Sequence, residues 1–399
     1  MSLSIAMICK NEEQDILKCL ESVAPVADEY VITDTGSTDN TIDIIKEFDK
    51  SVDIPVYLKH IEWEGNYFSG CRNYGLQFCS EPWIFWIDCD ETLISDSYDE
   101  VKEVVSRGDI YSAFAGLLSE LPDGRISKHY LPKFFRRGTA HFEGIVHNQL
   151  VHANPTLATG IEIYHTGYNL TQNRMAAKRK RTAKLLQRQI DKQANDAFAR
   201  MNLSRTLMND GEHKLALKIA EEGLEHNSSD SCEQMLFYSV AVCGTKLKQY
   251  EKAEEACWKA LRINAQNLDI TFALANVQFS QKRWSRAILF LNRYLQLKND
   301  ETVQPIQRQV NFLITDFFEA EDKAYNLLGI CYNKIGKKDK ALDMHRKAAQ
   351  CKNNPSLLKN LASLYEQCGK TLEAYRIWRH MVEEGYVNDF VIKKLREVA

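Results

Sequence analysis

Two apolar runs in the first part of the chain each stop at aspartates. The first has the sequence VITD (31–34) and the second WIFWIDCD (83–90). Short apolar runs of this kind predict buried strands. In open sheets of parallel strands, ligands bind at the carboxyl ends of the strands, where the loops leave them. The sequence therefore predicts a ligand site among the residues that follow these two runs.

The second run ends in an Asp-x-Asp pair, Asp88 and Asp90. If this segment is extended, side chains alternate with a period of two, so both carboxylates are expected on the same side. Two neighbouring carboxylates suit a hard divalent cation such as Mg²⁺ or Mn²⁺, which completes its coordination shell with water and phosphate oxygens. The pair therefore predicts a metal site that also receives phosphate groups.

Strand and helix patterns alternate through the first part of the chain. Strands are predicted at 3–8, 30–33, 56–58 and 83–87, with helical patterns between them. Alternation of this length predicts βαβ units and a mostly parallel α/β sheet. Further along, the turn sequence PDG (122–124) separates two apolar stretches and predicts a hairpin.

From about residue 195 onward only helical patterns remain. A small residue recurs within every second predicted helix, at Ala216, Ala253, Ala287, Ala341 and Ala374. Three of the four spacings lie close to the roughly 34 residues of a tetratricopeptide repeat. The longer step from Ala287 to Ala341 predicts an insertion near 299–320. The pattern predicts an all-α tetratricopeptide-repeat solenoid with a concave surface.

These patterns divide the chain into three predicted parts. An α/β domain covers 1–172, a basic linker helix covers 173–194, and the repeat domain covers 195–399. The linker is rich in lysine and arginine, with Asp191 as its acidic residue. We interpret it as a solvated connection between the domains. The alternative is that part of it lies beside the acidic site and binds a diphosphate.

Composition argues against several classes of protein. A formal net charge of −3 gives no overall attraction to nucleic acid or to an anionic membrane. Eleven cysteines are scattered without a Cys-x-x-Cys pair, which is typical of reduced thiols in the cytoplasm. No apolar run approaches the length of about 18 residues that a transmembrane helix needs, and the N-terminus does not resemble a signal peptide. The sequence predicts a cytoplasmic protein.

Four motifs in the first part of the chain occur in a characteristic order. They are MICKNEE (7–13), DTGSTDNT (34–41), RN (72–73) and WIFWIDCDE (83–91). Together they resemble a family 2 glycosyltransferase with the GT-A fold. The fusion to tetratricopeptide repeats resembles a bacterial subgroup that includes peptide S-glycosyltransferases. The resemblance implies a metal-dependent, inverting transferase that moves a sugar from a UDP-sugar to an acceptor.

The same resemblance assigns contacts to the nucleotide-sugar. It places Asn11 or Glu12 near the uridine, and Asp34 as the acceptor of a hydrogen bond from the uracil. Arg72 is placed against the nucleotide-sugar, and Asp88 on the ribose side. Simpler alternatives remain open, namely a turn residue for Asp34 and an exposed helix residue for Arg72.

The metal is assigned to Asp90, with His165 as a second ligand, because imidazole suits Mn²⁺. Asp90 acts in catalysis through this metal, which is Mn²⁺ or Mg²⁺. His147 is placed nearer the acceptor. Where the subgroup commonly has a glutamate, this chain has Asn148, so another group must serve as the base.

Glu143 is the expected catalytic base, and Glu91 and Asp123 are the alternatives. A base takes the proton of a hydroxyl acceptor, whereas a thiol acceptor ionises more readily and needs less help.

The repeats point to a peptide or protein as the acceptor. Within the transferase class, the competing acceptors are a cell-surface glycan and a lipid-linked precursor. A different class is a repeat scaffold with a degenerate transferase domain, against which the intact Asp34, Arg72, Asp88 and Asp90 argue. A homodimer is left open as a further partner. Neither the sugar nor the acceptor atom can be deduced from the sequence.

Overall fold

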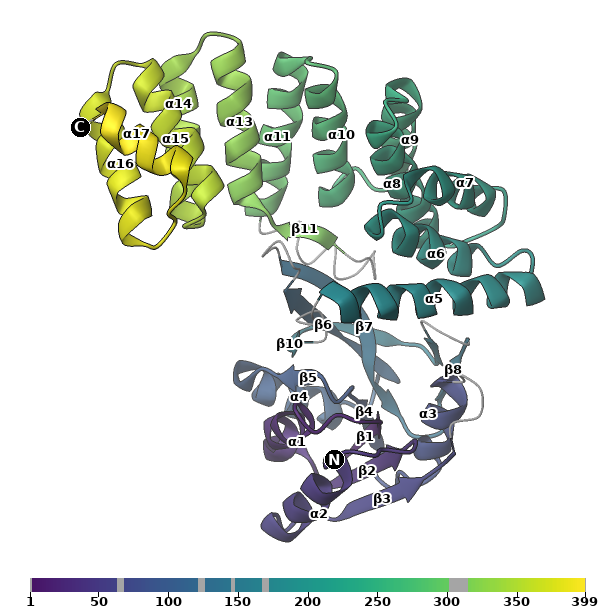
Figure 1. Ribbon diagram of the computed structural model, residues 1–399. Coiled ribbons are helices and arrows are strands. Elements are labelled where there is room, and N and C mark those ends of the chain that lie inside the picture. Colours follow the sequence, from purple (N-terminus) through teal and green to yellow (C-terminus); the bar gives the residue numbers. More distant parts are fainter. Residues whose placement is uncertain are drawn as a thin grey trace. The chain divides into compact units, whose positions relative to one another are not determined.

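The computed structural model of the protein describes residues 2–62, 68–120, 126–144, 148–166, 172–300 and 315–398. The chain forms two compact units (Figure 1). The first contains Met1–Ser239 and Gln304–Asp316, and the second contains Val240–Val303 and Phe317–Ala399. The first unit is an α/β domain with the first repeat helices, and the second consists mainly of further repeat helices. The domain boundaries expected from the sequence stay a prediction.

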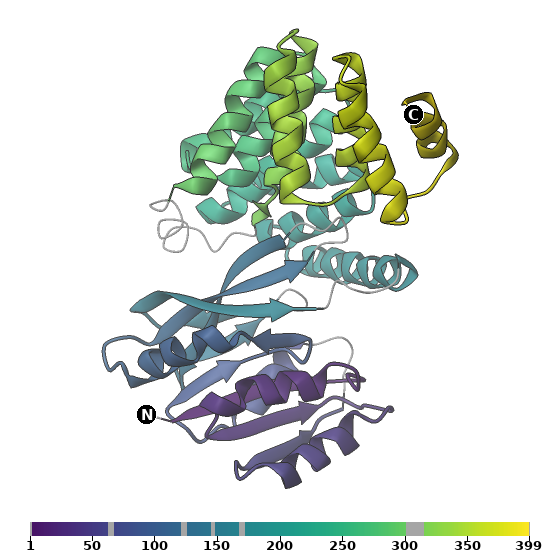
Figure 2. The ribbon, with the colours of Figure 1, turned by 90° about the vertical axis from the view of Figure 1, so that its left-hand side faces the viewer.

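The first unit is built on one large sheet (Figure 2). Its strand order is β3-β2-β1-β4-β7-β6-β10-β5. Strand β1 (Leu3–Cys9) lies between β2 (Glu29–Asp34) and β4 (Trp83–Trp86) and is parallel to both. Strand β3 (Val56–His60) runs parallel to β2. The predicted mostly parallel α/β sheet is therefore confirmed, and the carboxyl ends of these strands share one edge.

The second half of the sheet contains the antiparallel pairs. Strands β6 (Ser112–Glu120) and β7 (Ile126–Arg136) pair antiparallel, as predicted for the hairpin, whose turn lies outside the described residues. Strand β10 (Thr156–His165) runs parallel to β6. Strand β5 (Glu91–Leu93) pairs antiparallel with β10, so that Glu91 lies opposite His165. This pairing brings the segment after Asp90 to the end of β10.

Helices cover both faces of the sheet. Alternate residues of the parallel strands enter two different hydrophobic clusters, as the pleat requires: Ile5 and Phe85 belong to one, and Ala6 and Ile84 to the other. The first cluster includes residues of α1 (Ile16–Val23), α2 (Thr41–Ser51) and α4 (Tyr98–Ser106).

The second cluster lies beside α3 (Phe68–Leu76) and includes Phe142 of β8 (Ala140–Glu143). Strand β8 pairs with β9 (Gln149–His152) in a separate two-stranded sheet. Helix α3 and this hairpin therefore occupy the same side of the main sheet.

The basic segment forms helix α5 (Gln172–Lys192). Its apolar residues Leu185, Leu186 and Ile190 are buried in a cluster with residues of α6 (Ala197–Asn209) and α7 (His213–Leu224). Within residues 179–192, where the exposure of α5 is described, the exposed basic residues are Lys180, Arg181, Lys184, Arg188 and Lys192. The segment is thus an amphipathic helix packed against the first repeat.

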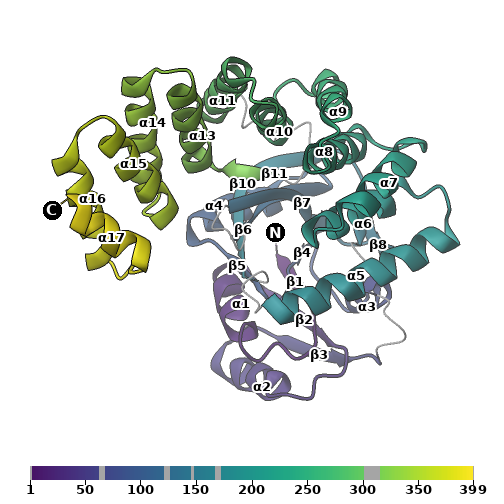
Figure 3. The same cartoon turned by 45° about the horizontal axis from the view of Figure 1, so that its top comes forward.

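The remaining helices follow one another in chain order (Figure 3). They are α8 (Asp230–Lys246), α9 (Tyr250–Ile263), α10 (Leu268–Ser280), α11 (Trp284–Asn299), α13 (Glu321–Lys334), α14 (Lys338–Cys351), α15 (Pro355–Gln367), α16 (Thr371–Glu383) and α17 (Asp389–Val398). None of the helices in the described ranges has the length and apolar character needed to cross a membrane.

The recurring alanines occupy equivalent places in the repeats. Each lies in a second helix, α7, α9, α11, α14 or α16, and each is fully buried: Ala216, Ala253, Ala287, Ala341 and Ala374. Small residues at these places let paired helices approach closely. The interruption between α11 and α13, which includes β11 (Thr315–Glu319), lies where the insertion was predicted. The predicted repeat architecture is confirmed.

Candidate active site

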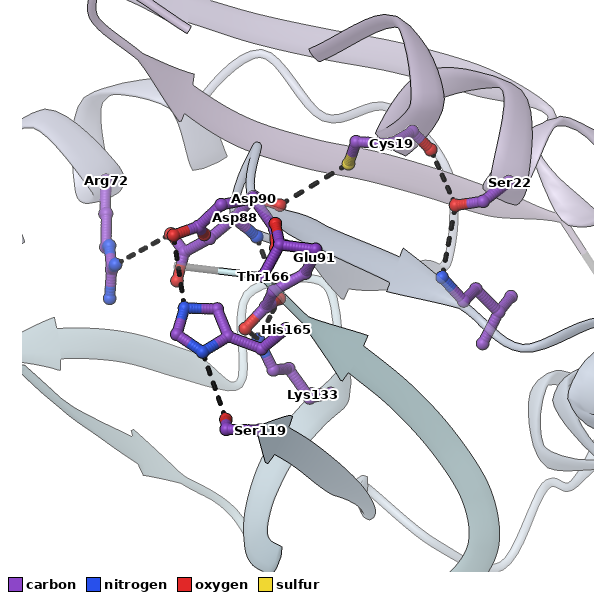
Figure 4. Close-up of polar contacts among 11 residues, drawn as sticks. Cys19, Ser22, Arg72, Asp88, Asp90, Glu91, Ser119, Lys133, His165 and Thr166 are labelled. Atoms are coloured by element: carbon purple, nitrogen blue, oxygen red, sulfur yellow. Dashed lines mark hydrogen bonds and ion pairs between the residues drawn. The ribbon is translucent and has the colours of Figure 1, made fainter. Parts of the chain in front are cut away.

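The Asp-x-Asp pair lies in a turn and not in an extended segment. Strand β4 ends at Trp86, and the N–H of Glu91 donates to the carbonyl of Asp88 at 3.0 Å. The expectation of an extended segment is therefore wrong, because the chain must turn here for β5 to reach β10. The carboxylates of Asp88 and Asp90 nevertheless lie side by side between Arg72 and His165 (Figure 4).

Asp90 contacts His165 at the end of β10. Asp90 Oδ2 lies 3.1 Å from His165 Nε2, and the other ring nitrogen lies 3.0 Å from the hydroxyl of Ser119. The N–H and hydroxyl of Thr166 donate to the carbonyl of Asp90 at 2.9 and 3.0 Å. Burial lowers the pKa of His165, but the hydrogen bond and negative charge of Asp90 outweigh this effect and raise it.

Asp90 and His165 fit a divalent cation that is shared with a substrate. Carboxylates suit Mg²⁺ and Mn²⁺, and imidazole is a common ligand of divalent first-row transition metals. Among the described residues there is no group of three or more His, Cys, Asp or Glu side chains placed to enclose a metal. Mg²⁺ and Mn²⁺ in phosphate-handling sites are commonly bound through one or two carboxylates together with substrate phosphates, so a third protein ligand is not required.

Arg72 is fixed by both of its aromatic neighbours and by Asp88. Its Nη2 donates to Asp88 Oδ1 at 3.0 Å, and its guanidinium carbon lies 4.2 Å from the Trp86 ring centroid and 5.1 Å from that of Phe142. The side chain is 15% exposed, so the alternative of an exposed helix residue is wrong. A guanidinium oriented in this way presents a planar cation beside the turn at residues 88–91, which we call the acidic turn.

The β8–β9 hairpin is attached to α3 through Asn73. The side-chain amide of Asn73 donates to the carbonyl of Phe142 at 2.9 Å, and its oxygen accepts the N–H of Phe142 at 2.8 Å. This places the hairpin beside Arg72. The next residue, Glu143, lies 2.9 Å from His141, and both side chains are exposed. His147 lies outside the described residues.

Asp34 organises the loop that follows β2. Its carboxylate accepts the N–H groups of Gly36 and Ser37, each at 3.0 Å, and lies 3.1 Å from His60 Nδ1. Burial raises the pKa of Asp34, but the hydrogen bonds from Ser37, Gly36 and His60 outweigh it and lower the pKa. The turn role is thus present in the structure, and the contact with uracil stays a prediction.

The loop after β1 contacts the loop after β2. Asn11 has a positive φ of 58°, and its side-chain oxygen accepts the N–H of Thr38 at 2.7 Å. The N–H of Glu12 donates to the hydroxyl of Thr41 at 2.8 Å. The predicted uridine residues Asn11, Glu12 and Asp34 are therefore brought together at one edge of the sheet. Their roles toward a nucleotide remain predictions.

This edge also contains the acidic turn. Strands β2 and β4 flank β1, and neighbouring strands lie about 4.8 Å apart, so the ends of β2 and β4 are separated by roughly 10 Å. The loops after β1 and β2 and the Asp88–Glu91 turn thus form one continuous rim. This is the place where open parallel sheets bind ligands.

Two residues that complete the site, Lys133 and Ser119, were not singled out from the sequence, and Asn73 was named only as part of the RN motif (72–73). Lys133 contacts Glu91, Ser119 contacts His165, and Asn73 contacts Phe142. Lys133 had a usable signal, because a single charged residue within the apolar stretch 130–135 needs a buried partner. Ser119 had no such signal, since its partner is distant in sequence, and the RN motif gave no indication of the contact between Asn73 and Phe142.

Two alternative bases were also expected from the sequence. The prediction of Glu91 as an alternative base is wrong. Its side chain is 2% exposed and accepts hydrogen bonds from Lys133 and from the N–H of Asp88. A group so enclosed does not reach an acceptor. Asp123 lies outside the described residues.

Comparison with known proteins agrees with this geometry. Residues 4–154 match the family model described as glycosyl transferase family 2. This chain carries a family 2 glycosyltransferase domain. Residues 245–310 match a tetratricopeptide-repeat model. The family 2 match covers β1 to β9, and so includes Asp34, Arg72, Asp88 and Asp90.

Several known proteins match part of this chain. The SPbeta prophage-derived glycosyltransferase SunS of Bacillus subtilis is 28% identical over 196 residues, which are 47% of this chain and 45% of SunS. A TPR repeat-containing protein of Synechococcus elongatus is 27% identical over 257 residues, 60% of this chain and 61% of the relative. The lipopolysaccharide core biosynthesis glycosyltransferase LpsC of Rhizobium meliloti is 35% identical over 111 residues, 27% of this chain and 39% of LpsC. The chain thus matches less than two thirds of the length of each relative.

Proposed function

We propose that this protein is a metal-dependent, inverting glycosyltransferase that moves a sugar from a UDP-sugar to a peptide or protein side chain. The observation that carries the proposal is the pairing of Asp90 with His165 at 3.1 Å, next to Arg72 and Asp88, within a family 2 domain. The rim of this domain supplies a carboxylate, an imidazole and a guanidinium together. This combination suits a diphosphate and its cation.

Three parts of the donor have candidate partners, namely the uridine, the ribose and the diphosphate. The uridine lies at Asn11, Glu12 and Asp34, and the ribose at Asp88. The guanidinium of Arg72 attracts the diphosphate, and its stacking on Trp86 keeps it in one orientation. When bound to Asp90 and His165, Mn²⁺ or Mg²⁺ supplies a positive charge that offsets the charge on the departing diphosphate.

Sugar transfer then requires one displacement. The acceptor heteroatom forms a bond to the anomeric carbon from the face opposite the diphosphate. The bond from that carbon to the diphosphate oxygen breaks, and its electron pair leaves with UDP, which inverts the anomeric centre. Glu143 takes the proton of the acceptor, and His141, 2.9 Å away, orients the Glu143 carboxylate.

The tetratricopeptide repeats support a peptide or protein as the acceptor. Repeat helices of this kind form extended concave surfaces that bind other chains. LpsC supports a second candidate, because its name places it in lipopolysaccharide core biosynthesis and it is 35% identical over its matched residues. On that basis the second candidate acceptor is a glycan.

A thermal-shift series tests the proposal. A ligand that binds only the folded state must raise the melting temperature. We expect UDP-sugars with Mn²⁺ to raise it, and Asp90→Asn to abolish the increase. Asp43→Asn is the matched control, because the Asp43 side chain is 76% exposed in α2. A wild-type protein that responds to no nucleotide would instead support a scaffold with a degenerate transferase domain.

Mass spectrometry separates the two acceptors. The protein is incubated with a panel of UDP-sugars and with either a peptide library or an oligosaccharide library. A mass increase on peptides that equals one transferred sugar residue supports the peptide acceptor. An increase confined to oligosaccharides replaces it with the glycan acceptor.

A further inference from the structure

Glu91, the last residue of the acidic turn, forms a buried ion pair with Lys133 of β7. Lys133 Nζ lies 2.7 Å from Oε1 and 2.6 Å from Oε2 of Glu91 (Figure 4). The side chains are 3% and 2% exposed. Removing two charges from water is costly, and a buried pair is often no more stable than apolar residues of the same volume. Stability alone is therefore a weak explanation for this pair.

Glu91 also closes the acidic turn through two hydrogen bonds to Asp88, one from its side chain and one from its backbone. One carboxylate oxygen accepts the N–H of Asp88 at 2.9 Å, and the N–H of Glu91 donates to the carbonyl of Asp88 at 3.0 Å. Because Lys133 fixes the Glu91 carboxylate from β7, it also determines where the N–H of Asp88 must lie. The backbone that precedes both site carboxylates is thereby tied to the centre of the sheet.

Glu91 also determines the distance between Asp90 and His165. Glu91 is the first residue of β5 and lies opposite His165 in the antiparallel pairing with β10. The residue before it is Asp90, whose carbonyl accepts the N–H of Thr166 at 2.9 Å. The position of Glu91 thus determines how Asp90 meets His165.

We propose that Glu91 and Lys133 are positioning residues that fix the Asp88–Glu91 turn in the shape in which Asp88 and Asp90 receive the cation and the UDP-sugar. This inference rests on the proposed function. Lys133 also offsets the charge of Glu91, so that the negative charge available to a cation is concentrated on the two aspartates. Neither residue touches the substrate.

Two apolar replacements of the pair test the proposal. Glu91→Leu/Lys133→Met and Glu91→Met/Lys133→Leu remove both charges together and preserve the buried volume, which avoids leaving one charge without its partner. We expect folded proteins whose affinity for Mn²⁺ and UDP falls at least tenfold. The measurements are the dissociation constant of Mn²⁺ by electron paramagnetic resonance and that of UDP by titration calorimetry.

A third variant separates positioning from charge. Glu91→Gln/Lys133→Met also lacks both charges but keeps an oxygen that can accept the N–H of Asp88. We expect it to recover most of the lost affinity. A purely structural role predicts that affinity follows the melting temperature of each variant, without this recovery.

Another lysine pair in the same sheet provides the matched control. Lys128, also on β7 and 3% exposed, forms an ion pair with Glu162 of β10. This ion pair joins β7 to β10 and does not include Asp88, Asp90 or Glu91. Lys128→Met/Glu162→Gln is therefore expected to leave the affinity for Mn²⁺ and UDP unchanged.

The outcomes distinguish this inference from the proposed function. If the wild-type protein binds neither Mn²⁺ nor UDP, the proposed function fails. If the wild-type protein binds both, Asp90→Asn does not, and a folded apolar variant binds as tightly as the wild type, the positioning role is overturned and the proposed function stands.

Discussion

The guanidinium of Arg72 donates to Asp88 at 3.0 Å, while its carbon lies 4.2 Å from the centroid of the Trp86 ring. Trp86 is the last residue of β4, and Asp88 begins the turn that follows it. The end of one strand thus supplies both the surface on which the arginine stacks and the carboxylate that it contacts. Helix α3 supplies the arginine, so the helix and the strand must keep their relative position for the site to exist.

Replacing Arg72 by lysine should weaken donor binding although the charge is kept. Lysine cannot stack its ammonium as a plane on Trp86, and it forms a point contact in place of a directed fork. We expect kcat/KM for the UDP-sugar to fall on the order of tenfold to a hundredfold, mainly through KM. Steady-state UDP release measures this change.

Arg136→Lys is the matched control for Arg72→Lys. Arg136 also lies over a tryptophan, at 5.0 Å from the Trp83 ring, but it donates to backbone carbonyls away from the acidic turn. Its replacement should lower the melting temperature and leave KM unchanged. An equal rise in KM for both variants would mean that Arg72 acts only through stability.

Most of the fold could be predicted from local patterns. Strands β1, β2 and β4 are largely apolar because helices bury both faces of the sheet around them. The repeat alanines recur at a fixed spacing because every helix pair needs the same close approach. Strands β8, β9 and β5 were not predicted, because they are short and their pairing depends on tertiary contacts with α3 and β10.

Less of the candidate site could be predicted. Asp88, Asp90 and Arg72 occur in motifs, so their proximity could be expected. The turn at Asp88 could not, because it forms only when β5 pairs with β10. Ser119 and Lys133 come from β6 and β7, far from Asp90 in sequence. The charge of Lys133 within an apolar stretch indicates that it needs a buried partner, but a single sequence without the sheet order does not identify that partner.

Replacing His165 should weaken metal binding more than nucleotide binding. Loss of an imidazole ligand leaves Asp90 as the main protein ligand, so we expect His165→Asn to lower Mn²⁺ affinity at least tenfold. His152→Asn is the control, because His152 also lies against a serine hydroxyl, that of Ser112 at 2.9 Å. Electron paramagnetic resonance of free Mn²⁺ measures both. Equal affinity in His165→Asn and the wild type would remove His165 from the metal site.

A methyl group at Gly75 should displace helix α3. A Cβ added there would lie 2.6 Å from the hydroxyl oxygen of Thr33 on β2. Since Thr33 is fully buried, the helix must shift, and we expect Gly75→Ala to cost roughly 1–3 kcal/mol. Because α3 contains Arg72, KM for the UDP-sugar should rise as well. Urea unfolding and steady-state kinetics measure the two effects.

Thr33→Ala should compensate for Gly75→Ala. Removing the hydroxyl vacates the space that the new methyl group needs. The double variant is expected to regain both stability and KM relative to Gly75→Ala. If stability returns and KM does not, the position of α3 is not what orients Arg72.

His345 makes the stability of the second unit depend on pH. Its ring is 4% exposed in α14 and packs on Gly329 of α13, where an added Cβ would lie 2.6 Å from Nε2. Burial lowers the pKa of His345 from 6.5 to about 4. As the pH falls below 6.5, the unfolded chain binds a proton that the folded chain rejects. The contribution is complete above pH 6.5 and is lost progressively toward pH 4.

Urea unfolding at pH 7.5 and pH 5 measures this contribution. A pKa difference of this size corresponds to about 2 kcal/mol lost between those two conditions. His345→Leu has no proton to bind and should lose correspondingly less stability over the same interval, although its stability at pH 7.5 also reflects altered packing. The comparison uses the change with pH within each protein, so that the packing difference cancels. If the free energy of unfolding falls equally in the two proteins, burial does not lower the pKa of His345 in the folded state.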